Sequence, residues 1–452
     1  MRKNYEIDML QGSYIKKLAI FAFPLMVSSV LQLLFNAADI AVVGRFAGDA
    51  SLAAVSSTSS LVNLFVNLFV GLSVGTNIIT AQMIGENKKE GIQKVVHTSI
   101  AMGVVYGIVV ALIGIFSSKK LLIMMSTPLD VIDLSTLYLK IYFIGMPANL
   151  VYNFGAALLR SKGDTKRPLY YLTISGAINV VLNLIFVVVF KLDVAGVALA
   201  TILSQLVSAV LVVMCLQNET DFLHFEIREC KMDIPTMLNV LKIGVPCGLQ
   251  GTVFAISNVV IQSTINSFGS VVMAGSGAAS NLEGFIFTAT NAFAQAGQTF
   301  IGQNYGAKKL KNIYSIGYIT TAYILIIGIL MSWGFYVYGP ELLGLYSKSP
   351  DVIAAGMVRV TYAGRFYFID ALMACFSSIL RGVGYVTLPT INTLVMVCGV
   401  RLLWVATLFK LNPVIWNLYI IYPISWIIVV TTHIITIVLV RKKVAEHCLT
   451  IE

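Results

Sequence analysis

Residues 18–43 read LAIFAFPLMVSSVLQLLFNAADIAVV, and Asp39 is the only charged side chain in this run. A bilayer core is about 30 Å thick, and a helix rises 1.5 Å per residue, so about 20 apolar residues are needed to cross it. The run is long enough, and it predicts a membrane-spanning helix that carries one carboxylate.

The composition extends this pattern to the whole chain. The 452 residues are 58% hydrophobic and 12% charged, and the mean hydropathy is +0.85. Soluble domains carry about 25% charged residues. A chain of this length with so few charges must use lipid as its solvent, so membrane lipid is its expected surroundings.

Eleven further apolar runs follow the first. Together they cover 18–43, 53–83, 95–116, 137–159, 169–190, 194–216, 240–268, 272–300, 316–338, 360–380, 388–409 and 415–440. The longest hydrophilic stretch lies between the sixth and seventh runs. The sequence therefore predicts an all-α integral membrane protein of twelve helices. It would comprise an N-lobe at 1–217, a cytoplasmic linker at 218–239 and a C-lobe at 240–452.

The formal net charge of +10 reflects basic residues that gather in short loops. Lysines and arginines favour one side of the predicted membrane by roughly two to one, and such loops are typically cytoplasmic. Both termini are then expected in the cytoplasm of a multi-pass plasma-membrane protein. The basic loops lack interleaved aromatic residues, so nucleic acid is not an expected partner.

The two halves resemble each other. Matching residues recur 221 positions apart: Arg160, Gly163 and Pro168 in the first half, and Arg381, Gly384 and Pro389 in the second. Each half holds six runs, an even number, so both halves would have the same orientation, as in repeats related by an axis along the membrane normal. We expect a V-shaped cleft between the lobes and alternating access by rocking.

Several short motifs give the chain a family resemblance. They are Leu10-Gln11-Gly12-Ser13, Phe21-Ala22-Phe23-Pro24, Asn36-Ala37-Ala38-Asp39, Gly302-Gln303-Asn304 and the two Leu-Arg-x-x-Gly loops. In this order they resemble the MATE (multidrug and toxic compound extrusion) transporters over nearly the whole chain. The resemblance implies two six-helix lobes and cation-coupled export of amphipathic, often cationic small molecules.

Asp39 is the leading candidate for the coupling residue. A carboxylate within a span costs roughly 2.5–3.5 kcal/mol on insertion scales, so it usually faces the bundle interior and has a function. Position alone leaves open that Asp39 only lies at the headgroup boundary near Arg45. The resemblance implies that it is the cation-coupling carboxylate of the family.

Four further polar residues are expected near Asp39. Asn179 and Asn183 share a helix face at i, i+4, and the resemblance matches both to the N-lobe cation site, with Tyr138 and Thr201. Asn183 departs from relatives that carry a second carboxylate there. A proton needs one carboxylate whereas sodium needs several converging oxygens, so protons are favoured over sodium. The alternative is that these side chains only join helices.

Two acids of the predicted C-lobe are secondary candidates. The resemblance matches Asp370 to a cation-site acid of the sodium-coupled branch, whose span-seven glutamate is replaced here by the apolar residues 253–255. Glu283 is the candidate replacement. A structural pair between Asp370 and Arg365 is the alternative. Pro24 removes a backbone hydrogen bond within the first run, and it is a candidate hinge or a static kink.

Other function classes lack their motifs. The four histidines are scattered without HExxH spacing and no P-loop is present, so we expect no enzyme, cofactor or metal site. The six cysteines form no CxxC pair and are expected to be buried thiols. A monomer is expected.

The alternative function is a flippase for lipids or lipid-linked oligosaccharides. Few basic residues lie within the runs, Arg401 being an exception, and an acidic cleft favours cationic cargo.

Overall fold

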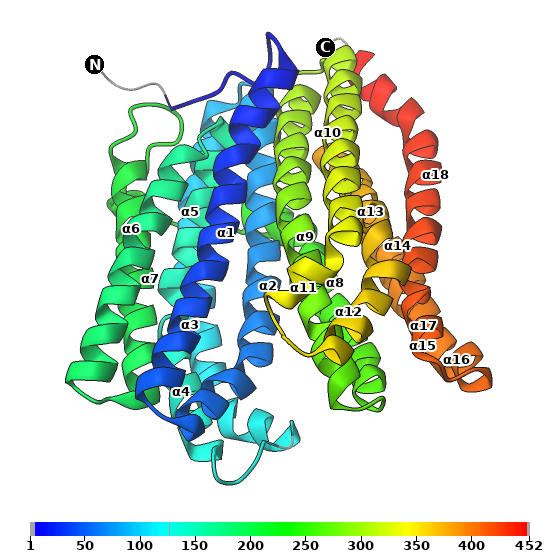
Figure 1. Ribbon diagram of the computed structural model, residues 1–452. Coiled ribbons are helices and arrows are strands. Elements are labelled where there is room, and N and C mark those ends of the chain that lie inside the picture. The colour runs from blue at the N-terminus through cyan, green and yellow to red at the C-terminus, as the bar shows by residue number, and fades with distance from the viewer. Residues whose placement is uncertain (1–4, 126, 450–452) are drawn as a thin grey trace. The chain divides into compact units, whose positions relative to one another are not determined.

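The computed structural model describes residues 5–125 and 127–449, and every regular element in these ranges is helical (Figure 1). The elements of the first half are α1 (Tyr14–Phe46), α2 (Asp49–Gly85), α3 (Lys89–Met124), α4 (Ile132–Ile144), α5 (Met146–Lys162), α6 (Lys166–Asn183), the π-helix η1 (Leu184–Val189) and α7 (Asp193–Gln217). A 3₁₀ turn, η2 (Ile227–Glu229), lies in the hydrophilic stretch that follows.

The second half begins with three long helices and continues with shorter, interrupted ones. Its elements are α8 (Ile234–Asn266), α9 (Ser270–Gly306), α10 (Leu310–Val337), α11 (Gly339–Gly344), α12 (Pro350–Tyr362), η3 (Gly364–Phe366), α13 (Tyr367–Gly382), α14 (Thr387–Thr393), the π-helix η4 (Leu394–Gly399), α15 (Val400–Ala406), α16 (Leu408–Leu411), α17 (Ile415–Tyr419) and α18 (Ile421–Leu449).

All twelve predicted runs coincide with helix. Ten spans in the described residues are long and apolar enough to cross a membrane, and α4 with α5, bent by 46°, form an eleventh. The remaining run, 272–300, lies in α9, which has 37 residues but is too polar to count among the ten. The all-α membrane fold is confirmed.

The chain divides into two compact units, and the division falls inside two helices. Unit 1 comprises the described residues up to Asp8 together with Val27–Gly248, and unit 2 comprises Met9–Met26 and the described residues from Leu249 onwards. The start of α1 therefore belongs to unit 2, and the start of α8 belongs to unit 1. Pro24 and Pro246 lie just before the two points of division. The predicted boundaries of the lobes and linker remain predictions.

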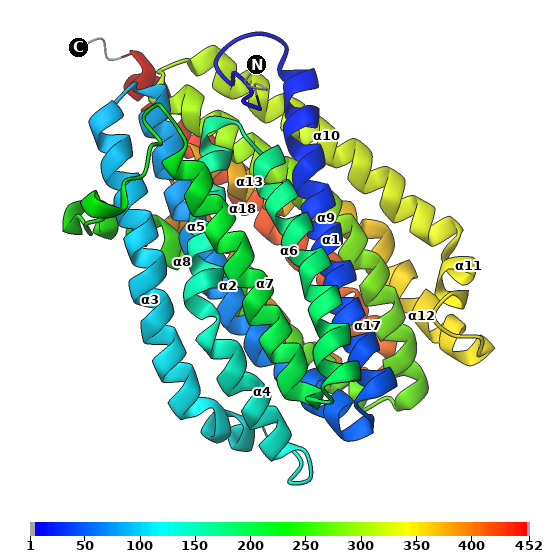
Figure 2. The ribbon, with the colours of Figure 1, turned by 90° about the vertical axis from the view of Figure 1, so that its left-hand side faces the viewer.

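Within unit 1, helices pack closely through small residues, as membrane helices commonly do. Gly71 of α2 faces Gly248 of α8 so closely that a Cβ at Gly71 would lie 2.1 Å from the Gly248 nitrogen. Elsewhere in the unit, α6 and α7 pack side by side (Figure 2). These helices fix the position of the polar side chains described below.

The repeated Leu-Arg-x-x-Gly motif ends a helix in each half. After α5, the Gly163 N–H donates to the Arg160 carbonyl at 3.0 Å and the Asp164 N–H to the Leu159 carbonyl at 3.0 Å. After α13, the same two bonds recur 221 residues later, at 2.9 Å each. The glycines adopt φ values of 107° and 88°, which only glycine adopts without strain. The motif is a Schellman cap.

Candidate functional site

Asp39 lies in α1, partly buried within unit 1. The amide Nδ2 of Asn183, at the end of α6, donates a hydrogen bond to its Oδ1. Asn183 is fully buried, because the i, i+4 face of α6 that carries it is turned into the unit.

The amides continue this contact as a chain of hydrogen bonds. The same Asn183 Nδ2 lies 3.3 Å from Oδ1 of Asn179, whose Nδ2 lies 3.5 Å from Oγ1 of Thr201 in α7. The Oδ1 atom of Asn183 is buried and has no hydrogen-bond partner. Side chains from α1, α6 and α7 therefore meet as expected, and they leave an unpaired carbonyl oxygen near Asp39.

Tyr138 lies in the same unit as this cluster, and no hydrogen bond from it to Asp39 is present among the described residues. It is buried in α4, its ring stacks on Tyr142 with 6.1 Å between ring centroids, and its hydroxyl interacts electrostatically with Asp39. Among the described residues, no lysine or arginine forms an ion pair with Asp39. Its negative charge is thus met by the Asn183 amide rather than by a fixed cation.

The C-lobe acids are in a different environment, within unit 2. Glu283 of α9 and Arg359 of α12 are both buried. The Arg359 guanidinium donates to both carboxylate oxygens, at 3.0 and 2.6 Å, and to Ser276 Oγ at 3.0 Å. The sequence did not predict this pair, because Arg359 lies just before the apolar run 360–380.

Asp370 does not meet the expected arginine. It is buried in the first turn of α13, and no ion pair joins it to an arginine among the described residues. Arg365 instead lies over the rings of Tyr336 and Phe366, 5.6 and 4.8 Å from their centroids. The alternative pairing of Asp370 with Arg365 is therefore wrong.

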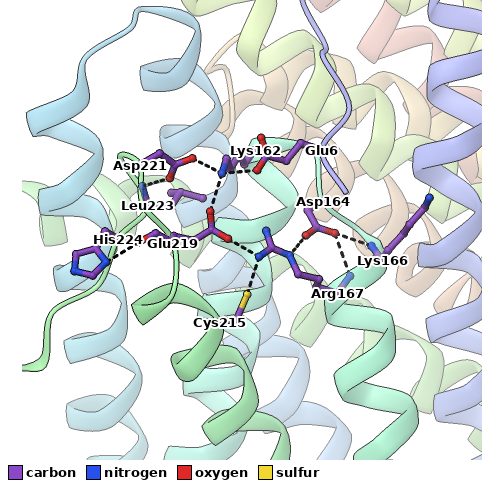
Figure 3. Close-up of polar contacts among 10 residues, drawn as sticks. All are labelled: Glu6, Lys162, Asp164, Lys166, Arg167, Cys215, Glu219, Asp221, Leu223 and His224. Carbon is purple, nitrogen blue, oxygen red and sulfur yellow. Dashed lines mark hydrogen bonds and ion pairs between the residues drawn. The ribbon is translucent and has the colours of Figure 1, made fainter. Parts of the chain in front are cut away.

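A second charged cluster lies where α5, α6 and α7 reach the loops of unit 1 (Figure 3). The Lys162 ammonium lies 2.5 Å from Glu6 and 2.8 Å from Glu219, and it also pairs with Asp221. The three carboxylates are close enough together to hold a metal ion, but the Lys162 ammonium already lies among them. This cluster is an ion-pair network built around a lysine.

Arg167 extends the network by pairing with Asp164 and Glu219 (Figure 3). Burial by itself would raise the pKa of Glu219, but hydrogen bonds from Lys162 and Arg167 outweigh it and hold that pKa below its ordinary value. Glu219 therefore stays ionised. The sequence feature that could have indicated this ion-pair network is the high density of charged residues in 160–167 and 219–221.

Pro24 and the cysteines are the remaining residues that the sequence singled out. Pro24 lies inside α1 and is buried, while its role as a hinge remains a prediction. Of the six cysteines expected to be buried thiols, four are buried, whereas Cys230 and Cys448 are only partly buried.

The sequence profile of the MatE family matches residues 24–185 and again residues 246–405. The two matches begin at Pro24 and Pro246, which supports the internal repeat.

Two curated relatives match most of the chain. The chain is 30% identical to the probable multidrug resistance protein YpnP of Bacillus subtilis, over 83% of this chain and 84% of that protein. It is 21% identical to the multidrug export protein MepA of Staphylococcus saprophyticus, over 91% of each.

Solved structures show the same fold. A crystal structure of MATE in the bent conformation superposes with a TM-score of 0.88 at 21% identity, covering 97% of this chain and 98% of that one. A transporter of the MOP superfamily from Pyrococcus furiosus superposes with 0.86 at 20% identity, over 98% of each chain. With a family profile that matches both halves and a twelve-helix fold shared nearly end to end, the chain belongs to the MATE family of membrane transporters.

Proposed function

We propose that this chain exports amphipathic, cationic organic compounds from the cell and that inward movement of a cation drives the export. Relatives named as multidrug resistance and export proteins support the export of organic compounds, and the negative charge of Asp39 favours cationic ones. The observation that carries the coupling proposal is Asp39, a partly buried carboxylate held by an amide without an ion-paired lysine or arginine among the described residues.

The environment of Asp39 supports reversible cation binding. The carboxylate and the unpaired Oδ1 of Asn183 are oxygen ligands of the kind that hard cations prefer. A proton needs only the carboxylate, and Asn183 supplies no second negative charge for a metal ion. We therefore favour protons over sodium as the coupling ion.

Antiport follows from competition for one negative charge. A cationic substrate is attracted to the N-lobe while Asp39 is ionised, and a cation bound at Asp39 removes that attraction. Linkage makes the effect reciprocal, so a bound substrate promotes cation release. Bending of α1 at Pro24 would connect the charge of Asp39 to movement of the helix.

Transport by purified protein in proteoliposomes tests the proposal. We expect uptake of a fluorescent cationic dye under an imposed pH gradient without sodium, and little uptake under a sodium gradient at uniform pH. Asp133→Asn is the matched control for Asp39→Asn. Asp133 is a carboxylate of the same unit that pairs with Lys119 at an exposed position. Transport driven by sodium alone would overturn the proton assignment. Translocation of a labelled lipid without dye transport would instead support the flippase alternative.

The orientation and surroundings of the chain belong to the same proposal. We expect a monomer in the plasma membrane with both termini in the cytoplasm, because the basic loops such as 160–167 are typical of the cytoplasmic side. Accessibility of single cysteines introduced at Lys166 and Lys120 to a membrane-impermeant reagent tests this. Lys166 should be reached only in inside-out vesicles, and Lys120 only in intact cells.

A further inference from the structure

One side of α18 changes from apolar to basic near the end of the helix. Four apolar side chains are 46–71% exposed there: Ile434, Ile435, Val438 and Leu439. Three exposed basic residues follow them: Arg441, Lys442 and Lys443. Val440 and Val444 are buried, so another side of the same turns packs against unit 2.

The exposed apolar and basic side chains are neighbours on the helix surface. Residues four apart lie one above the other on a helix, and this spacing joins Val438 to Lys442 and Leu439 to Lys443. Exposed apolar side chains of a membrane helix face acyl chains, and long basic side chains beside them reach the headgroup level. The polarity along this surface therefore matches that of a phospholipid with an anionic headgroup.

The protein does not itself neutralise the three basic residues. Throughout 5–125 and 127–449, no carboxylate forms an ion pair with Arg441, Lys442 or Lys443, and Glu446 is the one acid in 441–449. Further basic residues lie near this helix end. The ring of His447, one turn beyond Lys443, stacks on Tyr305 with 4.3 Å between ring centroids, and Lys308 and Lys311 follow Tyr305.

The general preference of basic residues for one side of a membrane could also place lysines at this helix end, without any bound lipid. The internal repeat shows that such a helix end does not require them. At the positions 221 residues earlier, the chain has Thr220, Asp221 and Phe222, and Asp221 pairs with Lys162 (Figure 3). Equivalent helix ends are thus neutralised within the protein in unit 1 and left positive in unit 2.

We propose that the exposed side of α18 binds an anionic phospholipid. The phosphate oxygens accept hydrogen bonds from Arg441, Lys442 and Lys443, and the acyl chains lie along Val438 and Leu439. Clusters of lysine and arginine next to a membrane helix are typical of such recognition. The inference does not depend on the proposed export, because none of these residues belongs to the Asp39 cluster.

Native mass spectrometry of the detergent-purified protein measures the bound lipid. We expect the wild type to retain phosphatidylglycerol more strongly than phosphatidylcholine with the same acyl chains, whose headgroup has no net charge. A basic residue near an anionic headgroup contributes about a fivefold gain in affinity. Arg441→Gln/Lys442→Gln/Lys443→Gln should therefore weaken phosphatidylglycerol binding on the order of 100-fold. Equal retention of the two lipids by the wild type would overturn the proposal.

A matched control removes three exposed lysines from unit 1. Lys88→Gln/Lys89→Gln/Lys94→Gln changes the net charge by the same amount, but Lys88 already pairs with Glu86 at 2.7 Å. This variant should bind phosphatidylglycerol as the wild type does. An equal loss in both triple variants would mean that net charge alone attracts the lipid, and it would refute a site on α18.

Milder variants keep the test valid if the triple change in α18 prevents folding. Lys442→Gln and Lys443→Gln should each weaken binding about fivefold. Lys442→Arg/Lys443→Arg keeps both charges and should keep the affinity. Wild-type affinity in both single glutamine variants would contradict the proposed contacts.

Two further measurements identify the occupant and its location. Inorganic phosphate should not displace phosphatidylglycerol, because it lacks the acyl chains that contact the apolar part of the surface; displacement would make a free anion the occupant and overturn the lipid assignment. Phosphatidylglycerol with a photoreactive acyl chain should label the peptide of α18 that contains Val438 and Leu439. Labelling confined to other helices would also refute the proposal.

Discussion

The acids of unit 1 and unit 2 differ in what compensates their charge. Asp39 accepts a hydrogen bond from the Asn183 amide, whereas Glu283 is held by the Arg359 guanidinium at 3.0 and 2.6 Å. With the 221-residue offset, the sequence position equivalent to Asp39 is Val260, and the position equivalent to Tyr138 is Arg359. A carboxylate met by dipoles remains able to bind a mobile cation, whereas a carboxylate met by a guanidinium is already paired. The two halves therefore share their helices but differ in the positions of their charged residues.

The largest effect is expected at the amide-held acid. Asp39→Asn should lower substrate accumulation against a gradient on the order of 100-fold, because it removes the group that couples the two movements. Dye efflux from energised cells measures it, with expression and thermal unfolding as controls for folding. If the variant still concentrates dye, Asp39 is not the coupling residue, and the contrast between the acids of the two units does not explain coupling.

The guanidinium-held acid should respond through stability. Arg359→Met leaves Glu283 buried and unpaired, at a cost of about 3–5 kcal/mol. Glu283→Gln/Arg359→Met should recover most of that loss, since both charges are removed together. Thermal unfolding of the detergent-purified variants measures this. A double variant as unstable as the single one would mean that Arg359 stabilises the unit through Ser276 and the rings of Tyr419 and Tyr422. Its pairing with Glu283 would then contribute little.

The Lys162 network gives unit 1 its own example of a fixed cation among acids. The pKa of Glu219 is lowered, so its stabilising contribution is present above its unfolded pKa, about 4.3, and is lost as pH falls through the lower folded pKa. Wild-type Tm should therefore fall on acidification. Lys162→Met should lower the Tm at neutral pH and reduce this acid sensitivity. Equal acid sensitivity in both proteins would remove Lys162 from the explanation.

The smallest effects concern the caps that both halves share. Gly163→Ala places a Cβ at a φ of 107° and 2.5 Å from the Ile7 carbonyl oxygen, so it should cost roughly 1–2 kcal/mol or more. Gly384→Ala, at a φ of 88°, should lower the stability only by the strain of placing a Cβ at positive φ. Thermal unfolding compares them. A neutral Gly384→Ala would show that the two Schellman caps are not equivalent.

The sequence by itself predicted the fold class, the positions of the spans and the repeat. Span length follows from bilayer thickness and rise per residue, so it can be predicted along the chain. The Leu-Arg-x-x-Gly motifs were predicted only as loops, and the structure shows them to be helix caps. The i, i+4 spacing of Asn179 and Asn183 similarly placed them on one face, and the structure joins that face to Asp39 and Thr201. Whether this cluster binds a cation remains a prediction.

Only the tertiary structure decided which charges compensate one another. Glu283 pairs with Arg359, Arg365 lies over the rings of Tyr336 and Phe366, and Lys162 pairs with three carboxylates. These partners come from different helices and loops. Helical periodicity determines which side chains share a face, but it leaves open which face of another helix they meet. That choice depends on packing across the whole unit.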